Sequence, residues 1–423
     1  MPFSLALLNV FLYASCVFYL FQAFLTRQLF PDIPYIKVLF FAFLGAVLLS
    51  LLNAPSELLH MSFRGVFKLC SYMVFTLAVF RGVNSKDKIQ KICMGFGISI
   101  FILSLDALFQ YAFGTDLLGR PLYNEAKYNG LDIWRATGSY AHPNDLGLYL
   151  GTFFFILLAY AFVTGSDPLR LRKNILTTKN IFFVSLGGSD PGYFFKKWML
   201  LGVCFISGLA IYFTFSRGTA LAFGVCYLLA FLFLRKKEMI LVAVCVAGVS
   251  VFFLPKDVYN WMHRIDSPKS LLFGGLEKEN PLSGGSRGGM WKTAWNMYKA
   301  HPVMGVGFYT FSDQYVSYKD KIDPNHNIRA HNSFIELMAE TGTLGLLSFL
   351  LLIGMVLFWA LKNLKKCKDP FLRLTLLGFS LAFLSFLIGS TYESTLRSVR
   401  LAPFFWLLLG MILANLHKIQ TKN

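Results

Sequence analysis

The stretch that decides the fold class runs from residue 142 to residue 164 and reads HPNDLGLYLGTFFFILLAYAFVT. Pro143 followed by Asn144 and Asp145 is typical of a helix start, because these residues suit a first turn whose N–H groups lack helical partners. The apolar run behind them has the length that a helix needs to cross a bilayer, about 17–25 residues. This stretch therefore predicts a transmembrane helix.

Similar apolar blocks recur along the chain, which is 56% hydrophobic and 15% charged. A soluble protein has about 25% charged residues. A helix satisfies its own backbone hydrogen bonds, as hydrocarbon requires. We therefore predict an all-α polytopic membrane protein with about 11–12 transmembrane helices. The candidate spans are approximately 3–25, 35–53, 63–80, 90–113, 142–164, 197–214, 218–234, 239–254, 332–360, 373–391 and 399–416.

The net charge of +18 is concentrated in short loops between these blocks. That placement fits membrane orientation and contact with anionic lipid rather than nucleic acid. The Lys- and Arg-rich loops are expected in the cytoplasm, which leaves 114–141, 215–217, 255–331 and 392–398 outside. We expect three parts: a transmembrane bundle over 1–254, an external loop region over 255–331, and C-terminal helices over 332–423.

Arg217 lies in the string Phe215-Ser216-Arg217-Gly218 between two apolar blocks. The blocks leave almost no connection, so we expect Arg217 at the apex of a helix–turn–helix, where Gly218 permits close backbone approach. One interpretation is an anion-binding side chain. The alternative is an Arg that only snorkels to the membrane surface.

Arg287 follows a Gly-rich approach, Gly284-Gly285-Ser286-Arg287-Gly288-Gly289-Met290-Trp291. A helix should follow, with Trp291, Ala294, Trp295 and Tyr298 on one face, and His301-Pro302 should end it. Flexible backbone, a helix N-terminus and a guanidinium together favour phosphate binding. The alternative is a flexible loop that happens to contain an Arg.

His331 precedes Asn332, which we expect to cap the helix of the ninth span. This places an imidazole at the outer boundary of the membrane, where neutral His can accept a proton from a hydroxyl. Glu336 shares the next helical face with Asn332. The alternative is a purely structural His.

Three further cations are candidates for substrate binding. Arg64 and Lys68 are spaced i, i+4 near the outer surface, so they either snorkel to head groups or line an inward cavity and attract a diphosphate. Arg135 precedes the helix start at Pro143 and contacts either a sugar or phosphate, or only solvent. No metal-ligand spacing stands in an outer segment, and we expect neither metal nor other cofactor.

Taken together, these strings resemble the O-antigen ligase and O-antigen polymerase superfamily of bacterial inner-membrane proteins. The matching strings are Phe215-Ser216-Arg217-Gly218, Ser286 to Trp291 with His301-Pro302 and Gly305-Val306-Gly307, and Ala330-His331-Asn332 with Glu336 and Thr341-Gly342. The resemblance implies a GT-C-like helical fold in the inner membrane, with the site on the periplasmic side.

The resemblance also implies a metal-independent, inverting glycosyl transfer. The donor would be a polysaccharide on undecaprenyl diphosphate, and the acceptor a lipid A–core sugar in a ligase or a second lipid-linked repeat unit in a polymerase. Arg217 and Arg287 would hold the diphosphate, and His331 would orient or deprotonate the acceptor. From their charge and position alone, we expect Arg135, Arg64, Lys68, Trp291, Asn332 and Glu336 to bind substrate. A lipid-linked glycan transporter or flippase without catalysis, and transfer to a protein, are the alternatives.

Overall fold

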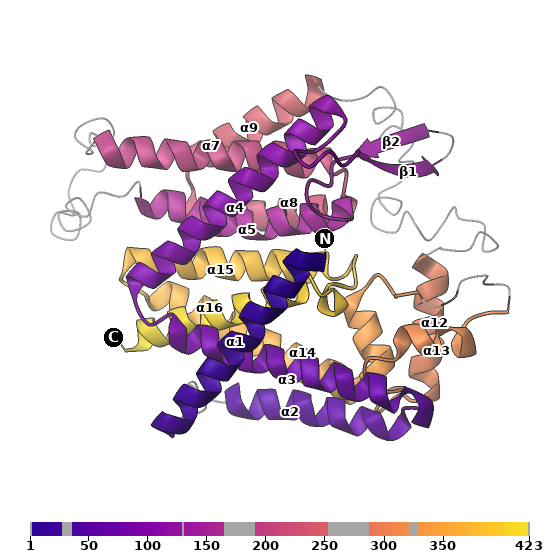
Figure 1. The fold of residues 1–423 in the computed structure, drawn as a ribbon. Coiled ribbons are helices and arrows are strands. Elements are labelled where there is room, and N and C mark those ends of the chain that lie inside the picture. The colour runs from indigo at the N-terminus through magenta and orange to yellow at the C-terminus, as the bar shows by residue number, and fades with distance from the viewer. Residues whose placement is uncertain are drawn as a thin grey trace. The chain divides into compact units, whose positions relative to one another are not determined.

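The computed structural model describes residues 2–27, 36–128, 131–164, 191–252, 287–321, 323, 326 and 328–421 (Figure 1). Contacts within the chain divide it into two compact units. The first comprises Met1–Asn84, Asn260–Asn363 and Phe386–Asn423, and the second comprises Ser85–Tyr259 and Leu364–Ser385. The three-part division expected from the sequence stays a prediction.

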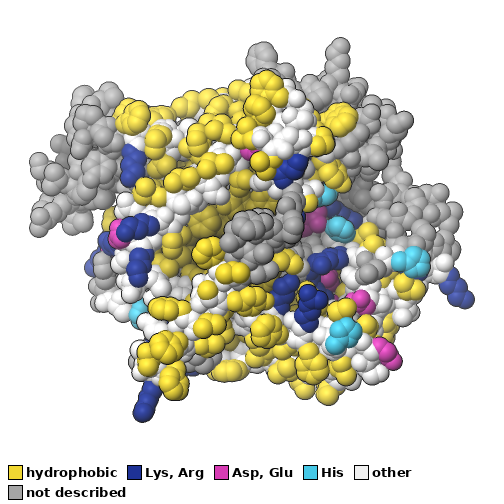
Figure 2. Space-filling model, in the orientation of Figure 1, with side chains coloured by type: hydrophobic (Ala, Val, Ile, Leu, Met, Phe, Trp, Pro, Cys, Tyr) yellow, Lys and Arg dark blue, Asp and Glu magenta, His cyan; other side chains and the backbone are white. Residues whose placement is uncertain are grey.

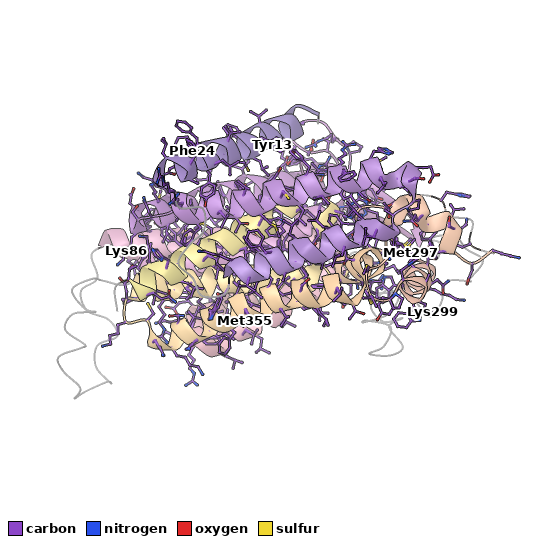
Figure 3. All side chains as sticks on the ribbon, turned by 90° about the horizontal axis from the view of Figure 1, so that it is seen from below. Tyr13, Phe24, Lys86, Met297, Lys299 and Met355 are labelled. Atoms are coloured by element: carbon purple, nitrogen blue, oxygen red, sulfur yellow. The ribbon has the colours of Figure 1, made fainter. Side chains whose placement is uncertain are left out.

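The prediction of an all-α multi-pass membrane protein is confirmed. Each expected span coincides with a helix, and nine helices in the described part of the chain are long and apolar enough to cross a membrane. Val10–Thr26 and Lys237–Phe252 are apolar but shorter. Phe24 points away from the protein (Figure 3), and hydrophobic side chains cover much of the face in Figure 2, as lipid contact requires.

The first unit is built around α16, which is buried along most of its length. Thr76 of α3 donates a hydrogen bond to the carbonyl of Trp406 at 3.0 Å, and Gly410 lets α16 approach the backbone of α3. Small residues allow such close helix packing in membranes. The helices of this unit are α1 (Pro2–Thr26), α2 (Ile36–Ser50), η1 (Leu51–Asn53), η2 (Ser56–Leu58), α3 (Leu59–Gly82), α12 (Arg287–Ala300), α13 (Phe311–Tyr318), most of α14 (Ser333–Lys366), η3 (Thr395–Arg397) and α16 (Ala402–Gln420).

The second unit is built around α5, whose residues are buried on all sides, as its continuous apolar sequence predicts. Gly147 and Gly151 lie against Thr219 of α8, and Gly378 of α15 lies against Ala159. This unit contains α4 (Lys86–Phe113), β1 (Tyr123–Tyr128), β2 (Leu131–Arg135), α5 (Pro143–Thr164), α7 (Pro191–Phe213), α8 (Arg217–Leu234), α9 (Lys237–Phe252) and most of α15 (Pro370–Gly389).

The expected outer loop 114–141 contains structure that the sequence did not reveal. β1 and β2 pair as an antiparallel hairpin, and α4 fixes the chain on either side of it. The Asp106 carboxylate accepts a hydrogen bond from the Leu117 N–H at 3.0 Å. The Gln110 side-chain oxygen accepts from the N–H groups of Thr137 and Gly138, both at 2.8 Å.

The helix α14 is kinked, whereas the sequence predicted a single uninterrupted span over 332–360. Gly342 has φ 64° and ψ −163° inside the helix, a left-handed region that only Gly enters freely. The kink frees backbone groups that a regular helix would pair internally. The N–H groups of Val306 and Gly307 donate to the carbonyls of Ala339 and Glu340 at 3.0 and 3.1 Å.

A second pair of hydrogen bonds between α14 and residues 302–307 runs in the opposite direction, from α14 to this segment. The N–H groups of Thr343 and Leu344, beyond the kink, donate to the carbonyls of Pro302 and Val303 at 2.9 and 3.2 Å. Residues 302–307 are therefore hydrogen-bonded into the break in α14, which leaves these buried backbone groups satisfied. This junction places α12 and α13 beside the start of α14 (Figure 1).

We predict that Gly342→Ala destabilises the protein. The new Cβ would lie 2.4 Å from the carbonyl of Val303, and the left-handed conformation alone costs a non-Gly residue about 1–2 kcal/mol. The measurement is the thermal unfolding midpoint of purified protein. Gly354→Ala on the same helix meets no atom within 4 Å and should leave the midpoint unchanged. Equal behaviour of the two variants would contradict the proposed role of the kink.

Candidate active site

Glu393 connects two of the predicted catalytic residues within the first unit. One carboxylate oxygen, Oε2, lies 2.9 Å from Nδ1 of His331. The other, Oε1, lies 3.8 Å from Nη2 of Arg287. The three residues come from the segment before α14, the loop after α15 and the first position of α12. A cation, an anion and a titratable ring therefore share one site.

α12 positions Arg287 and also holds the segment that carries His331. The helix begins at Arg287 and ends at Ala300, as the Gly-rich approach and His301-Pro302 predicted. The indole N–H of Trp291, expected to bind substrate, donates to the carbonyl of Ala330 at 2.9 Å. This bond fixes the backbone next to His331, so in this structure Trp291 supports the site from within the protein.

The face of α12 that packs inside the protein overlaps only in part with the aromatic face predicted from the sequence. Met290, Thr293, Ala294 and Met297 are the buried residues, and the apolar ones among them pack with Phe311 and Tyr315 of α13. Trp295, expected on that face, is 49% exposed, with its ring 5.1 Å from that of Tyr298. The aromatic face was predicted to lie in the membrane interface, which stays a prediction. The methionines, which fill irregular cores well, pack the helix inside the protein.

Backbone geometry presents the His331 ring outward. His331 has φ 48°, an uncommon conformation outside Gly that is found more often at functional sites. Asn332 then caps α14 as predicted, since its side-chain oxygen accepts from the N–H groups of Phe334 and Ile335 at 3.0 and 3.1 Å. The His331 side chain is 42% exposed, so solvent or a ligand can reach the ring.

The contact between His331 and Glu393 decides which ring nitrogen can act as a base. An ionised carboxylate only accepts hydrogen bonds, so Nδ1 carries the proton toward Glu393. Nε2 of the neutral ring then has a free lone pair. A ring that a carboxylate orients in this way can take a proton from a hydroxyl.

A buried ionic cluster lies behind this site. Nε of Arg397 lies 3.2 Å from Oε1 of Glu336, and Nη2 is hydrogen-bonded to Oε1 of Glu340. The Arg397 side chain is 10% exposed, and the two carboxylates are 3% and 1% exposed. The guanidinium carbon also lies 3.8 Å from the centre of the Tyr309 ring. Glu336, which was predicted to contact substrate, is therefore paired with Arg397 inside the protein.

Of Arg64 and Lys68, the two other cations predicted to bind substrate in the first unit, Lys68 lines a pocket. Its ammonium donates to the Tyr309 hydroxyl at 3.4 Å, and its side chain is part of the pocket wall. Arg64, one turn earlier on α3, is exposed and outside that wall. Of the two interpretations drawn from the sequence, lining an inward cavity therefore fits Lys68, and reaching toward lipid head groups fits Arg64.

Arg217 and Arg135 belong to the second unit. α7 ends at Phe213 and α8 begins at the exposed Arg217, so the predicted turn apex is confirmed. Arg135 is not the surface cation of the alternative interpretation, because it is buried. Its Nε donates to the carbonyl of Thr214 at 2.8 Å and its Nη2 to the Asn144 side chain at 2.6 Å. Arg135 therefore supports the turn before Arg217.

Part of the chain, including Arg217, Arg287 and His331, is similar to a known protein family. The sequence profile described as O-antigen ligase matches residues 202–350. Residues 202–350 are therefore similar to the O-antigen ligase family. This region includes Arg217, Arg287, His331 and Glu336, and the resemblance inferred from the sequence is confirmed.

A curated relative is similar over part of the chain. The chain is 24% identical over 266 residues to the exopolysaccharide production protein ExoQ of Rhizobium meliloti (strain 1021). The match covers 60% of this chain and 54% of that protein, so the chain spans about half of the relative's length. The predicted site roles stay predictions.

Glu393 and Arg397 were not among the residues predicted to form the site. Both lie beyond the region matched by the O-antigen ligase family, in the short loop that precedes α16. Two charged residues at i, i+4 in a loop between two apolar helices were the available signal. The Gly-rich stretch before Arg287, including Ser286, lies outside the described residues.

In the described part of the chain, no three His, Cys, Asp or Glu side chains gather in a way that could hold a metal ion. This leaves the expectation of a metal-independent reaction untested.

We predict that Arg397→Met lowers the free energy of unfolding by about 3–5 kcal/mol, because it leaves two buried carboxylates without their cation. Thermal unfolding of the purified protein is the measurement. Adding Glu336→Gln and Glu340→Gln should recover most of the loss. Lys292→Met, which breaks an exposed ion pair with Asp320, should cost at most about 1 kcal/mol. An Arg397→Met loss no larger than this control would refute the prediction.

Proposed function

We propose that the protein is an O-antigen ligase. It transfers a polysaccharide from undecaprenyl diphosphate to a sugar hydroxyl of lipid A–core at the periplasmic face of the bacterial inner membrane. The bridge that Glu393 makes between His331 and Arg287 carries this proposal, because it joins a general base to a phosphate-binding cation. The family match supports the reaction class.

The proposed step is a direct displacement. The acceptor hydroxyl oxygen attacks the anomeric carbon, and its proton passes to Nε2 of His331. The bond between the anomeric carbon and the diphosphate oxygen breaks, and its electron pair stays on the diphosphate. Attack opposite the leaving group inverts the anomeric centre. The imidazolium then returns its proton to solvent.

Arg287 is assigned to the leaving diphosphate. A guanidinium can bind two phosphate oxygens in a fork and stabilise the charge that develops there. Its distance of 3.8 Å from Glu393 exceeds that of a tight pair, so the carboxylate orients the side chain and leaves its N–H groups available. The family resemblance assigns Arg217 to the same diphosphate.

A polymerase that joins lipid-linked repeat units is the second candidate. The similarity to a protein named for exopolysaccharide production favours it, and the same chemistry at His331 and Arg287 would serve it. The candidates differ in the acceptor. A transporter or flippase of lipid-linked glycans is the rival that involves no bond making.

The test is a transfer assay with purified full-length protein, a defined lipid-linked donor and lipid A–core. We expect glycan attached to lipid A–core. Detection of lengthened glycan that is still attached to the lipid carrier would show that the protein is a polymerase and not a ligase. No product with either acceptor, together with donor movement across a vesicle membrane, would establish the transporter and exclude both enzymes.

We predict that Arg287→Ala or Arg217→Ala lowers turnover in this assay by about 10²–10³, the usual loss when one charge-stabilising donor is removed. Arg287→Lys should retain more turnover than Arg287→Ala but less than the unchanged protein, because an ammonium cannot form the bidentate fork. Glu393→Gln should fall between these variants, since the amide keeps an acceptor for His331 but loses the charge. Lys292→Ala on the same helix is the control. Near-normal transfer by a folded Arg287→Ala protein would show that Arg287 does not stabilise the leaving diphosphate.

A further inference from the structure

The exposed side of α12 carries large apolar side chains that enter none of the steps above. Trp295 is 49% exposed, and Val303, three residues beyond the end of the helix, is 53% exposed. The Trp295 ring lies 5.1 Å from the ring of Tyr298, with the two planes inclined by 30°. Neighbouring exposed apolar groups of this size mark an interaction surface.

This apolar patch continues onto α14. The Tyr298 hydroxyl lies 2.9 Å from Oγ1 of Thr343, and the N–H of Leu344 donates to the carbonyl of Val303 at 3.2 Å. Leu344 and Leu347 are exposed and share one face of α14, being spaced i, i+3. Since α14 has the length and hydropathy of a membrane span, its exposed leucines face lipid. The patch on α12 is therefore continuous with a lipid-facing surface.

The direction of α12 also fits contact with a membrane. In Figure 1, α12 runs across the direction of α2 and α3, at one end of these two spans. Figure 3, turned by 90°, shows the same helix nearly end-on, beside the labels of Met297 and Lys299. A helix that lies across the spans at their end runs parallel to the membrane surface, as amphipathic interfacial helices do.

The two edges of the exposed side of α12 differ in polarity. Tyr298 forms the edge next to α14, whereas Lys292 forms the opposite edge and pairs with Asp320 at 2.7 Å. Trp295 lies between them, and the exposed Lys299 follows it by one turn. Trp and Tyr are enriched where membrane meets water, and a Lys beside them can extend its ammonium to the head groups. One edge therefore suits lipid and the other suits water.

We propose that α12 lies in the membrane–water interface, with Trp295, Tyr298 and Val303 in contact with lipid and Lys299 at the head groups. The partner is the bilayer surface. An aromatic pair can also stack on a sugar, but here the leucines of α14 extend the patch and offer sugar hydroxyls no hydrogen bond. The contact holds Arg287, the first residue of α12, near the level of the head groups, whatever Arg287 binds.

The test is site-specific photo-crosslinking of the full-length protein in nanodiscs of phosphatidylethanolamine and phosphatidylglycerol. One diazirine amino acid replaces Trp295, Lys292 or Leu347 in turn, and mass spectrometry measures the yield of lipid adducts at that position. Position 347 gives the yield for full lipid contact, and position 292 is the matched control on α12. We expect the yield at 295 to approach that at 347 and to exceed that at 292 by about 10-fold, because only the aromatic edge contacts lipid.

Three results would overturn the proposal. The first is a lipid yield at 295 no higher than that at 292. The second is a crosslink from 295 to another copy of the chain in place of lipid, and the third is labelling at 295 by an added oligosaccharide in place of lipid. Trp295 is exposed, so its replacement should leave the thermal unfolding midpoint unchanged, and the same probe at Val303 tests the same surface. Transfer is not the readout, so the result is independent of the proposed reaction.

Discussion

The ionic contact of Arg397 with Glu336 and Glu340 is the interaction on which the first unit depends. Burying three charges is costly unless each is paired and hydrogen-bonded. Here the carboxylates lie on the first two turns of α14, and the guanidinium lies on η3, between α15 and α16. The Glu340 side chain also accepts a hydrogen bond from the N–H of Phe311 at 2.9 Å. One cluster thus connects α14 to η3 and to the start of α13.

The site follows from this arrangement. Ser394, next to Glu393, donates to Glu336 at 2.5 Å, and the Ser333 hydroxyl donates to the Glu393 carbonyl at 3.1 Å. The loop with Glu393 is therefore fixed to the helix that begins just after His331. The kink at Gly342 acts from the other side, because it anchors residues 302–307 and with them α12 and Arg287. One anchor thus holds the loop with Glu393, and the other holds α12 with Arg287.

Much of the fold could be predicted because membranes make the relation between sequence and structure local. A long apolar block must be helical, and a turn must follow where it ends. The positions of Arg217 after a tight turn, of Arg287 at a helix start and of Asn332 as a cap all follow from neighbours within a few residues. The break in α14 does not, because Gly342 lies in a run that reads as an uninterrupted span.

The amino-acid sequence by itself determined the fold class and most helix positions, and it indicated the family resemblance and three candidate residues. Only the tertiary structure decided that Glu393 joins His331 to Arg287, that Arg135 is buried, and that Arg397 pairs with Glu336 and Glu340. The reason is distance along the chain. His331 and Glu393 are 62 residues apart, and Glu340 and Arg397 are 57 apart. Hydropathy and helix signals extend over a few turns, whereas these ion pairs form only after separate helices have packed together.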